Sequence, residues 1–384
     1  MDKFDFTFID LFGGIGGFHI ALSRLGGKCV LYSDIDTKSA SVYKHNFGMN
    51  NSGDIRKLTI SQIPDFDVLC AGFPCQSFSN AGHKKAMNDD RGLLFNNIID
   101  IIRIKQPKLC ILENVKHIKK VSNGAVYKHI YDRLHELNYD VHDDVHNVLE
   151  FGIPQNRERC VFIAIRQTSF PDTHSDIVST FKRLMPQLKT KLQPSFVKCY
   201  QSKLRTLNPT YLEKYRLSDK IMCVLNTWNT LIKQLPVDTN ISFPLITDFW
   251  FTEFTLVELD RFPKWKKNYI HKNQHFYTTH KVLLDKWYTS NSDNLSGRDI
   301  YRKLEWQVGK IKPHDTIFNY YIQFRQSGIR VKNGQYFPTL VAINQTSIIG
   351  REQRYISPIE CSFIQSFPYN FIIDTVDKNA YKQF

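Results

Sequence analysis

The sequence predicts an α/β protein with a doubly wound sheet in its first 165 residues, and two observations support this prediction. Short runs rich in β-branched and aromatic residues alternate with amphipathic stretches at the spacing of βαβ units. The first run leads directly into a glycine-rich turn, and loops of this kind lie at the ligand-binding edge of doubly wound sheets. After residue 165 the alternation ends, so a smaller, irregular second region is expected there.

The expected elements follow one another along the chain. Residues 7–12 form the first strand, and a helix over 18–25 leads to a second strand over 28–32. The later elements are strands over 67–71, 109–112 and 159–165 and helices over 96–105 and 124–137. Near the end, Ser357 is expected to cap a helix, with Pro358 as its first residue and Glu360 as capping-box partner, and residues 361–367 are expected to continue it as a short amphipathic helix.

The composition is that of a folded chain. Hydrophobic residues make up 42% of the 384 residues and charged residues 23%, which excludes wholesale disorder. No apolar run reaches the ~18 residues of a membrane span, and the first residues lack the features of a secretory signal, so a cytoplasmic protein is expected. The eight cysteines show neither CxxC spacing nor a zinc-ligand cluster, so no metal is expected.

The net charge of +14 is unevenly distributed. Residues 1–165 hold 20 Lys and Arg against 19 Asp and Glu, whereas residues 166–384 hold 31 against 18. One interpretation is a near-neutral catalytic region joined to a region that binds a polyanion. The other is a lysine-rich, solvated surface, and composition alone leaves both open.

The glycine-rich turn indicates a ligand site. Residues 13–17 are Gly-Gly-Ile-Gly-Gly, and small residues between a strand and a helix let the backbone approach a ligand. Asp34 follows about 20 residues later at the end of the second strand, where an acid can bind a ribose. The spacing is not GxGxxG, so a nucleoside cofactor and a purely structural turn remain equally open at this point.

Three further segments lie at strand ends. Cys75 follows Gly-Phe-Pro after an apolar strand, where a proline-held turn can project a reactive thiolate into a cleft. Glu113 follows the next strand, and Arg157 and Arg159 precede or begin the last one. Each segment alone is more typical of an ordinary loop than of a site.

Taken together and in this order, these segments resemble the DNA cytosine-C5 methyltransferases of bacterial restriction-modification systems. The resemblance rests on FIDLFGGIGGFHIAL (8–22), GFPCQSFS (72–79), RGLLF (91–95), ENV (113–115) and QNRER (155–159). It covers residues 1–165 almost continuously and resumes over 349–384. It implies the Rossmann-like sheet of the methyltransferases that use S-adenosylmethionine.

The resemblance also implies an activity. Such enzymes transfer a methyl group from S-adenosylmethionine to C5 of a cytosine flipped out of a specific duplex DNA sequence. By resemblance Cys75 forms the covalent bond to C6, and Glu113 holds or protonates N3. Arg159, with Arg157 as the weaker candidate, contacts the base or orients the acid. The implied cofactor-binding residues are Asp10, Phe12, Gly14, Gly17, Asp34, Asp54, Ile55 and Pro74.

Some of these residues also have a simpler interpretation. Asp54 is otherwise a turn residue. Ile35 occupies a position where the family varies, and we expect it only to pack against other apolar groups.

The resemblance also implies a division of the chain into domains. Residues 1–165 are expected to form the catalytic domain, 166–348 a target-recognition domain, and 349–384 the late motif that starts the return to the catalytic domain. The expected DNA-binding residues are Gln76, Ser79, Arg91, Lys264, Lys266, Arg325 and Arg330. Residues 76–91 would form a loop that closes over the base. For each cation, a solvated surface remains the alternative.

The family pattern continues beyond the point where this sequence stops. At Phe384 relatives proceed to a Gly-Asn-Ser-Val segment and a final helix, so a truncated chain is expected, with a second polypeptide as a possible source of that motif. Two other functions stay open: DNA binding without complete catalysis, and methylation of cytosine C5 in RNA. The setting implied by the resemblance is a bacterial or phage-encoded protein at the nucleoid.

Overall fold

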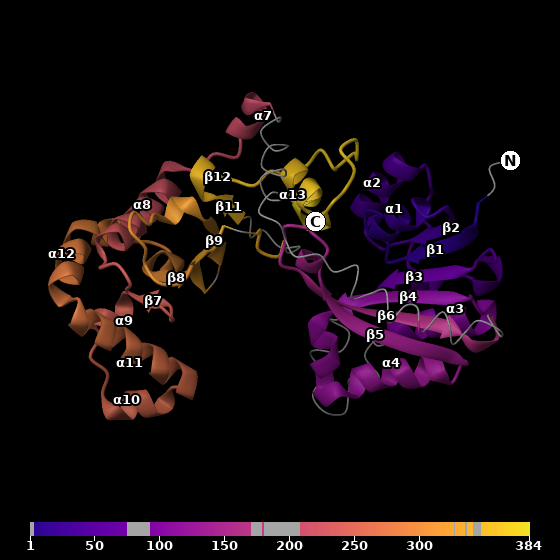
Figure 1. The fold of residues 1–384 in the computed structure, drawn as a ribbon, viewed down its shortest axis with the longest axis horizontal. Coiled ribbons are helices and arrows are strands. Elements are labelled where there is room, and N and C mark those ends of the chain that lie inside the picture. Colours follow the sequence, from indigo (N-terminus) through magenta and orange to yellow (C-terminus); the bar gives the residue numbers. More distant parts are fainter. Residues whose placement is uncertain are drawn as a thin grey trace. The chain divides into compact units, whose positions relative to one another are not determined.

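The computed structural model describes residues 4–74, 93–169, 179, 208–325, 327–334, 336–340 and 347–384. The chain divides into two compact units. The first unit comprises Met1–Gln193 and Ser366–Gln383, and the second comprises Pro194–Gln365 and Phe384. Figure 1 shows the ribbon, and each unit is described by itself.

A six-stranded sheet forms the centre of the first unit, as far as the structure describes it, in the order β2-β1-β3-β4-β6-β5 (Figure 1). The strands are β1 (Phe6–Leu11), β2 (Gly27–Ser33), β3 (Val68–Gly72), β4 (Leu109–Val115), β5 (Tyr139–Asn147) and β6 (Glu158–Arg166). The first four are parallel, and β6 runs antiparallel to both of its neighbours. Leu69, Cys70 and Ala71 are fully buried, as expected for a central parallel strand covered on both faces.

The helices in the described part of the first unit are α1 (Gly17–Ser23), α2 (Thr37–Phe47), α3 (Leu93–Lys105), α4 (Ala125–His135) and α14 (Asp377–Gln383). The predicted strands and the helices near 18–25, 96–105 and 124–137 are confirmed, with ends shifted by a few residues. Three of the described helices and strands of this unit had not been predicted, namely α2, α14 and β5. Helix α2 has few apolar residues, and polar β5 pairs only with β6 at the sheet edge.

The second unit contains its own sheet, in the order β12-β11-β9-β10-β8-β7 within the described residues. Its strands are β7 (Leu245–Ile246), β8 (Lys303–Gln307), β9 (Tyr321–Arg325), β10 (Gly328–Lys332), β11 (Ser347–Ile349) and β12 (Arg354–Tyr355). This sheet lies in the region where the sequence pattern allowed no assignment. Its strands are short, and two of them have only two residues, so no periodicity could develop along them.

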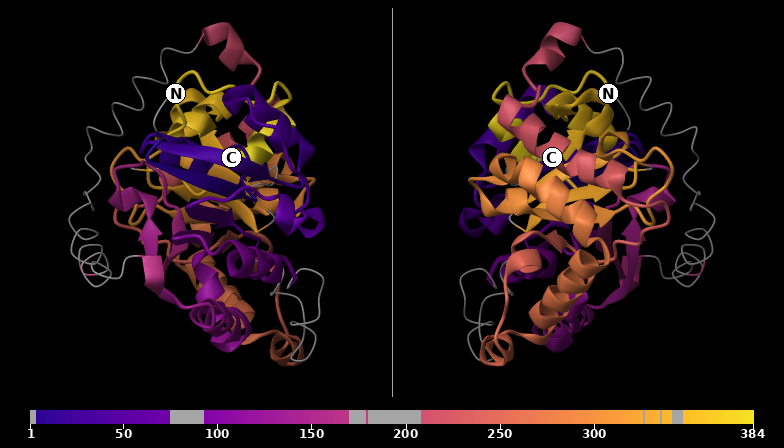
Figure 2. Two further views of the ribbon diagram at one scale, coloured as in Figure 1. Left: turned by 90° about the vertical axis from the view of Figure 1, so that its right-hand side faces the viewer. Right: turned by 90° about the vertical axis from the view of Figure 1, so that its left-hand side faces the viewer.

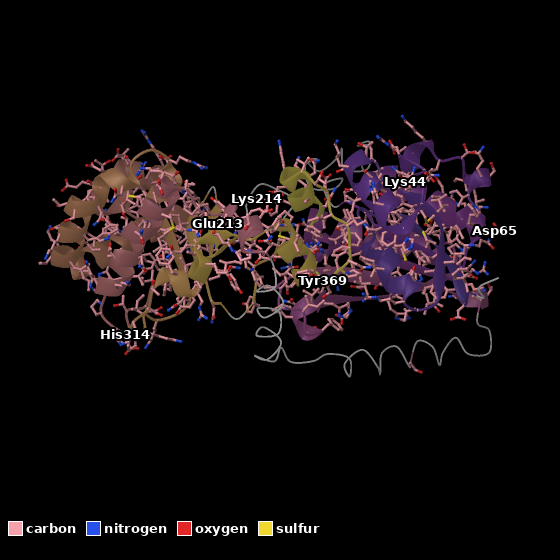
Figure 3. The ribbon with its side chains drawn as sticks, turned by 90° about the horizontal axis from the view of Figure 1, so that it is seen from above. Lys44, Asp65, Glu213, Lys214, His314 and Tyr369 are labelled. Atoms are coloured by element: carbon pink, nitrogen blue, oxygen red, sulfur yellow. The ribbon has the colours of Figure 1, made fainter. Side chains whose placement is uncertain are left out.

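Seven helices of the second unit lie in the described residues: α7 (Pro209–Glu213), α8 (Asp219–Gln234), α9 (Asp248–Phe251), α10 (Leu256–Arg261), α11 (Lys264–Thr279), α12 (Lys281–Asn291) and α13 (Pro358–Ile364). Helices α8 and α12 lie on one side of the sheet (Figures 1 and 2). Trp228 and Trp287 from these helices join Leu304, Ile322 and Ile329 of the strands in one buried core. Exposed side chains such as Lys44 of the first unit and His314 of the second point outward (Figure 3).

The predicted helix start at Ser357 is confirmed. The Ser357 hydroxyl accepts from the amide of Glu360, the Glu360 carboxylate accepts from the amide of Ser357, and Pro358 occupies the first turn. The Glu360 carboxylate also accepts two hydrogen bonds from the buried guanidinium of Arg354. The helix ends at Ile364, three residues before the predicted end. Cys361, Ser362, Phe363 and Ile364 are all buried, so the prediction of an amphipathic helix here is wrong. None of the described helices has the length and apolar character needed to cross a membrane.

Candidate active site

The carboxyl ends of β1, β2, β3 and β4 lie at one edge of the first sheet, because these strands are parallel neighbours. We call this edge the carboxyl edge, and it comprises residues 12–17, 34–36, 73–74 and 113–115. The antiparallel strand β6 begins at the same edge, where Arg159 pairs in register with Val115. The sequence-predicted motifs that the structure describes therefore meet here.

The glycine-rich loop is held open by its own backbone conformation. Gly14 and Gly16 have φ values of 54° and 96°, in the left-handed region that favours glycine. A side chain at Gly13 would meet the Asp10 carboxylate within 2.8 Å, and one at Gly16 would meet the Phe47 ring at 2.2 Å. By contrast, nothing lies within 4 Å of a Cβ built on Gly14 or Gly17. Open space therefore borders the loop at these two positions.

Asp10 is fully buried beneath this loop. The Tyr43 hydroxyl donates to its Oδ2 at 3.2 Å, whereas its Oδ1 is buried without a hydrogen-bond partner among the described residues. Burial raises the pKa of Asp10 to about 7, the Tyr43 hydrogen bond opposes this shift, and the charge of Asp34 adds to it. A buried carboxyl with an unsatisfied oxygen is poised to accept a hydrogen bond from a cationic ligand.

Asp34 supports the loop from the end of β2. Its carboxylate accepts from the amides of Gly14 at 2.8 Å and Asp36 at 2.7 Å. Asn51 bonds both backbone groups of Asp34, with its Oδ1 accepting from the amide and its Nδ2 donating to the carbonyl. Burial raises the pKa of Asp34. The neighbouring Ile35 is 68% exposed, so the expectation that it packs against apolar groups is wrong.

Asp54 and Ile55 differ in their surroundings. Asp54 caps a short helical turn and forms an ion pair with Arg56 at 2.5 Å, and that hydrogen bond lowers the pKa of Asp54. Ile55 is 5% exposed and belongs to the core of the unit. Hydrogen bonds from Ser33 to the carbonyl of Gly53 and from the amide of Ser52 to the carbonyl of Tyr32 fasten this segment to the end of β2.

Glu113 and Arg159 form the second half of the carboxyl edge. The Arg159 Nε lies 2.7 Å from the Glu113 Oε1, and both side chains are partly exposed. The other oxygen of Glu113 lies 3.5 Å from a Cβ built on Gly72, so the carboxylate lies beside the end of β3. Asn114 Nδ2 donates to the carbonyl of Phe73 at 2.9 Å and thereby holds the segment that leads to Pro74.

Arg157 lies close to this pair. Burial lowers the pKa of Arg157 to about 10, the charge of Arg159 adds to the shift, and the charge of Glu113 opposes it. Arg157 therefore stays cationic near neutral pH.

Four predicted site residues lie outside the described residues, namely Cys75, Gln76, Ser79 and Arg91, as does the expected loop over 76–91. Pro74 is the last described residue before them and is exposed. Three side chains that the sequence analysis missed hold candidate site segments in place through hydrogen bonds: Tyr43, Asn51 and Asn114. Asn114 lies inside the ENV motif, so its position directly after Glu113 was an available signal.

The predicted DNA-binding cations of the second unit fall into two groups. Lys264 and Lys266 lie on α11, and the Lys266 Nζ is 3.6 Å from the centre of the Phe262 ring. Arg325 lies on β9 and Arg330 on β10. Lys266 and Arg330, which are far apart in sequence, line one groove of about 910 Å³. Among the described residues, no cluster of three or more potential metal ligands occurs.

The fold and the carboxyl edge define the class of this protein: a Rossmann-like methyltransferase sheet with a glycine loop after β1 and an acid after β2. The family model of the C-5 cytosine-specific DNA methylases matches residues 6–384. The chain belongs to that family, and the resemblance stated from the sequence is confirmed.

Individual relatives match shorter segments. The chain is 45% identical to the Type II methyltransferase M.HhaI of Haemophilus parahaemolyticus over 159 residues, which are 41% of this chain and 49% of that protein. It is 45% identical to the Type II methyltransferase M.HpaII of Haemophilus parainfluenzae over 184 residues, 45% of this chain and 51% of that protein. The matched segment thus spans about half the length of these relatives.

Two solved structures resemble the whole chain in fold. The S. pombe Dnmt2 methyltransferase has a TM-score of 0.53 at 16% identity and covers 98% of this chain and 93% of its own. The Entamoeba histolytica methyltransferase EhMeth has a TM-score of 0.51 at 17% identity, with coverage of 99% and 93%. At this identity the likeness establishes a shared fold.

Proposed function

We propose that this chain transfers a methyl group from S-adenosylmethionine to C5 of a cytosine in a specific duplex DNA sequence. The observation that carries the proposal is the Glu113–Arg159 pair at the end of β4, beside the Gly72-Phe73-Pro74 segment. The glycine loop and Asp34 lie at the same edge. Family membership and the Type II methyltransferases among the relatives support the same activity.

The residues of the carboxyl edge fit the proposed cofactor. The Oδ1 of Asp10, which has no hydrogen-bond partner among the described residues, would accept a hydrogen bond from the ammonium group of S-adenosylmethionine. The open space beside Gly14 and Gly17 would let the cofactor lie against the backbone of the glycine loop. Asp34 would accept from the ribose, and Phe12, Asp54, Ile55 and Pro74 would complete the wall. When bound, S-adenosylmethionine supplies a methyl group activated by its sulfonium.

The protein's own residues would activate the base. Cytosine C5 is a weak nucleophile, and addition of the Cys75 thiolate to C6 would place electron density on C5. Glu113 would hold the proton at N3 and stabilise the charge that develops there. Arg159 would keep the Glu113 carboxylate oriented, and Arg157 would add positive potential. After C5 is methylated, loss of its proton and expulsion of Cys75 would restore the free enzyme.

The second unit would bind the DNA. Residues 166–384 carry most of the positive charge, and Lys264, Lys266, Arg325 and Arg330 are the proposed contacts. Gln76, Ser79 and Arg91 are proposed contacts from the segment beyond Pro74. A bacterial or phage restriction-modification setting in the cytoplasm is part of the same proposal.

Labelled methyl transfer tests the proposal. The purified chain is incubated with methyl-labelled S-adenosylmethionine and either mixed-sequence duplex DNA or tRNA, and the modified bases are identified. We expect 5-methylcytosine in DNA only. Label in tRNA alone would favour the RNA alternative, and DNA binding without label in either substrate would favour a DNA-binding chain with incomplete catalysis.

A further inference from the structure

The sheet of the second unit has one apolar and one polar face. Leu304 of β8 pairs with Ile329 of β10, Ile322 of β9 pairs with Val331 of β10, and all four side chains are buried in the core. The adjacent row, Glu305, Arg330 and Gln323, must point to the opposite face because side chains alternate along a strand. We call that opposite face the polar face.

Arg330 is fixed within this row. Its Nε donates to Glu305 Oε2 at 2.6 Å, and the side chains of Arg330 and Glu305 are only 19% and 11% exposed. Gln307 Nε2 also donates to the same oxygen, at 3.3 Å, which restrains the carboxylate. Within the described part of the chain, neither Nη of Arg330 makes a hydrogen bond. The terminal edge of the guanidinium, with its two parallel donors, is therefore held in place and available.

The polar face carries an excess of cations. Lys303, Arg325 and Lys332 share it with Arg330, and Glu305 is its one acid among the described strand residues. Burial lowers the pKa of Arg325 and of Lys332, and the charge of Arg330 lowers both further. The cations of this cluster repel one another in the free protein, and a bound polyanion would reduce that repulsion.

Helix α11 forms the other wall of the groove of about 910 Å³. It contributes Trp265, Lys266 and Tyr269, and Trp265 is 62% exposed. The other acid that lines the groove, Asp248, is paired with Arg302 at 2.8 Å. The groove thus combines a fixed guanidinium edge with exposed aromatic and cationic groups, and all of them belong to the second unit.

We propose that Arg330 recognises one guanine of the DNA target and that Glu305 is the positioning residue that sets its orientation. Two parallel N–H donors match the O6 and N7 acceptors that guanine alone presents together in the major groove. This inference rests on the proposed function, since it takes duplex DNA as the ligand. A phosphate would also accept from Arg330, but a phosphate contact would carry no base preference.

The test is selection of binding sites from a randomised duplex library by the whole chain. Wild type is compared with Arg330→Lys, Glu305→Gln and a matched control, Arg216→Lys. Arg216 is an exposed arginine of the same unit that pairs with Glu213. Thermal unfolding of each variant reports whether the fold is kept, and the salt dependence of binding reports the number of phosphate contacts.

Wild type should prefer guanine at one or more positions. Arg330→Lys should lower the preference at one of them by about tenfold or more while the salt dependence stays the same, because the charge is kept. Glu305→Gln should weaken the preference at that same position by a smaller factor, and Arg216→Lys should leave the profile unchanged.

Three outcomes would overturn the inference: an unchanged profile for folded Arg330→Lys, a loss of affinity that is uniform over all sequences, or a wild type that selects no guanine. A wild type that binds no duplex at all would overturn the proposed function as well, and labelled methyl transfer would then fail too.

Discussion

The two units place their functional groups in different ways. In the first unit the groups come from short contiguous motifs, each at the end of a strand, and they meet because parallel strands share an edge. In the second unit they come from one face of a sheet and from a helix, and strand register decides which of them meet. We therefore expect the chemistry of the first unit to depend on a few groups in fixed positions, and the DNA affinity of the second unit to be spread over many cations.

The largest effect should come from the pair at the end of β4. Glu113→Gln removes the carboxylate that stabilises the charge at N3 and should lower kcat by about a hundredfold or more, with DNA affinity little changed. Methyl transfer at saturating DNA measures this. Glu158→Gln is the control, because Glu158 is an exposed neighbour that pairs with Lys116. Equal losses in both variants would contradict the assigned role.

The next effect concerns Asp10 and the cofactor. Asp10→Asn should weaken S-adenosylmethionine binding by about 10- to 100-fold, the worth of a hydrogen bond between charged groups. The pKa of Asp10 is raised to about 7, so its carboxylate ionises as pH rises towards that value. Wild-type affinity should therefore increase between pH 5.5 and 7, and the variant should lack this increase. Calorimetric titration at both pH values measures it, and parallel pH profiles would contradict the account.

The same residue should affect the stability of the cofactor-free protein. A pKa raised from 3.8 to about 7 means that the folded state binds more protons than the unfolded state in this interval. The free energy of unfolding should thus decrease as pH rises from about 4 to about 7. Asp10→Asn cannot ionise and lacks this penalty, so above pH 7 the variant should be more stable than wild type by up to about 4 kcal/mol. Urea unfolding at pH 5 and pH 8 tests the sign.

The smallest effects are expected on α11. Lys264→Ala and Lys266→Ala should each weaken DNA binding only a few-fold, equally for all sequences. Each should also reduce the slope of log affinity against log salt concentration by about one. Lys233→Ala, on exposed α8 surface, is the control. If replacing a single α11 lysine abolished the sequence preference, the proposal that these lysines contribute only sequence-independent affinity would be contradicted.

The sequence predicted the first unit in most of its detail, and for a physical reason. Buried parallel strands are continuous apolar runs, and the residues after them must lie at one edge, so the sequence pattern alone places Asp34 and Glu113 at the same edge. Arg159 reaches that edge because β6 is antiparallel, which the sequence pattern does not reveal. The sequence pattern did not predict the exposure of every residue at this edge. Ile35, next to Asp34, was expected to pack against apolar groups, yet its side chain is exposed. The partners of Asp10 were also hidden, since Tyr43 reaches it from a helix with little apolar pattern.

The second unit could not be predicted in the same way. Arg330 was a candidate for its residue type, but its partner Glu305 lies 25 residues away on a strand that is parallel to β10. Only strand register reveals that pair, and short strands carry too few residues for a sequence pattern to specify the register.

We propose that the first unit performs the chemistry through Cys75 together with Glu113 and Arg159. The most direct test is a duplex that contains 5-fluorocytosine at the methylated position, incubated with the whole chain and S-adenosylmethionine, followed by mass spectrometry of the peptides under denaturing conditions. The account predicts a covalent adduct at Cys75, lost in Cys75→Ser and kept in Cys223→Ser. An adduct at another cysteine, or none with a duplex that wild type methylates, would contradict it.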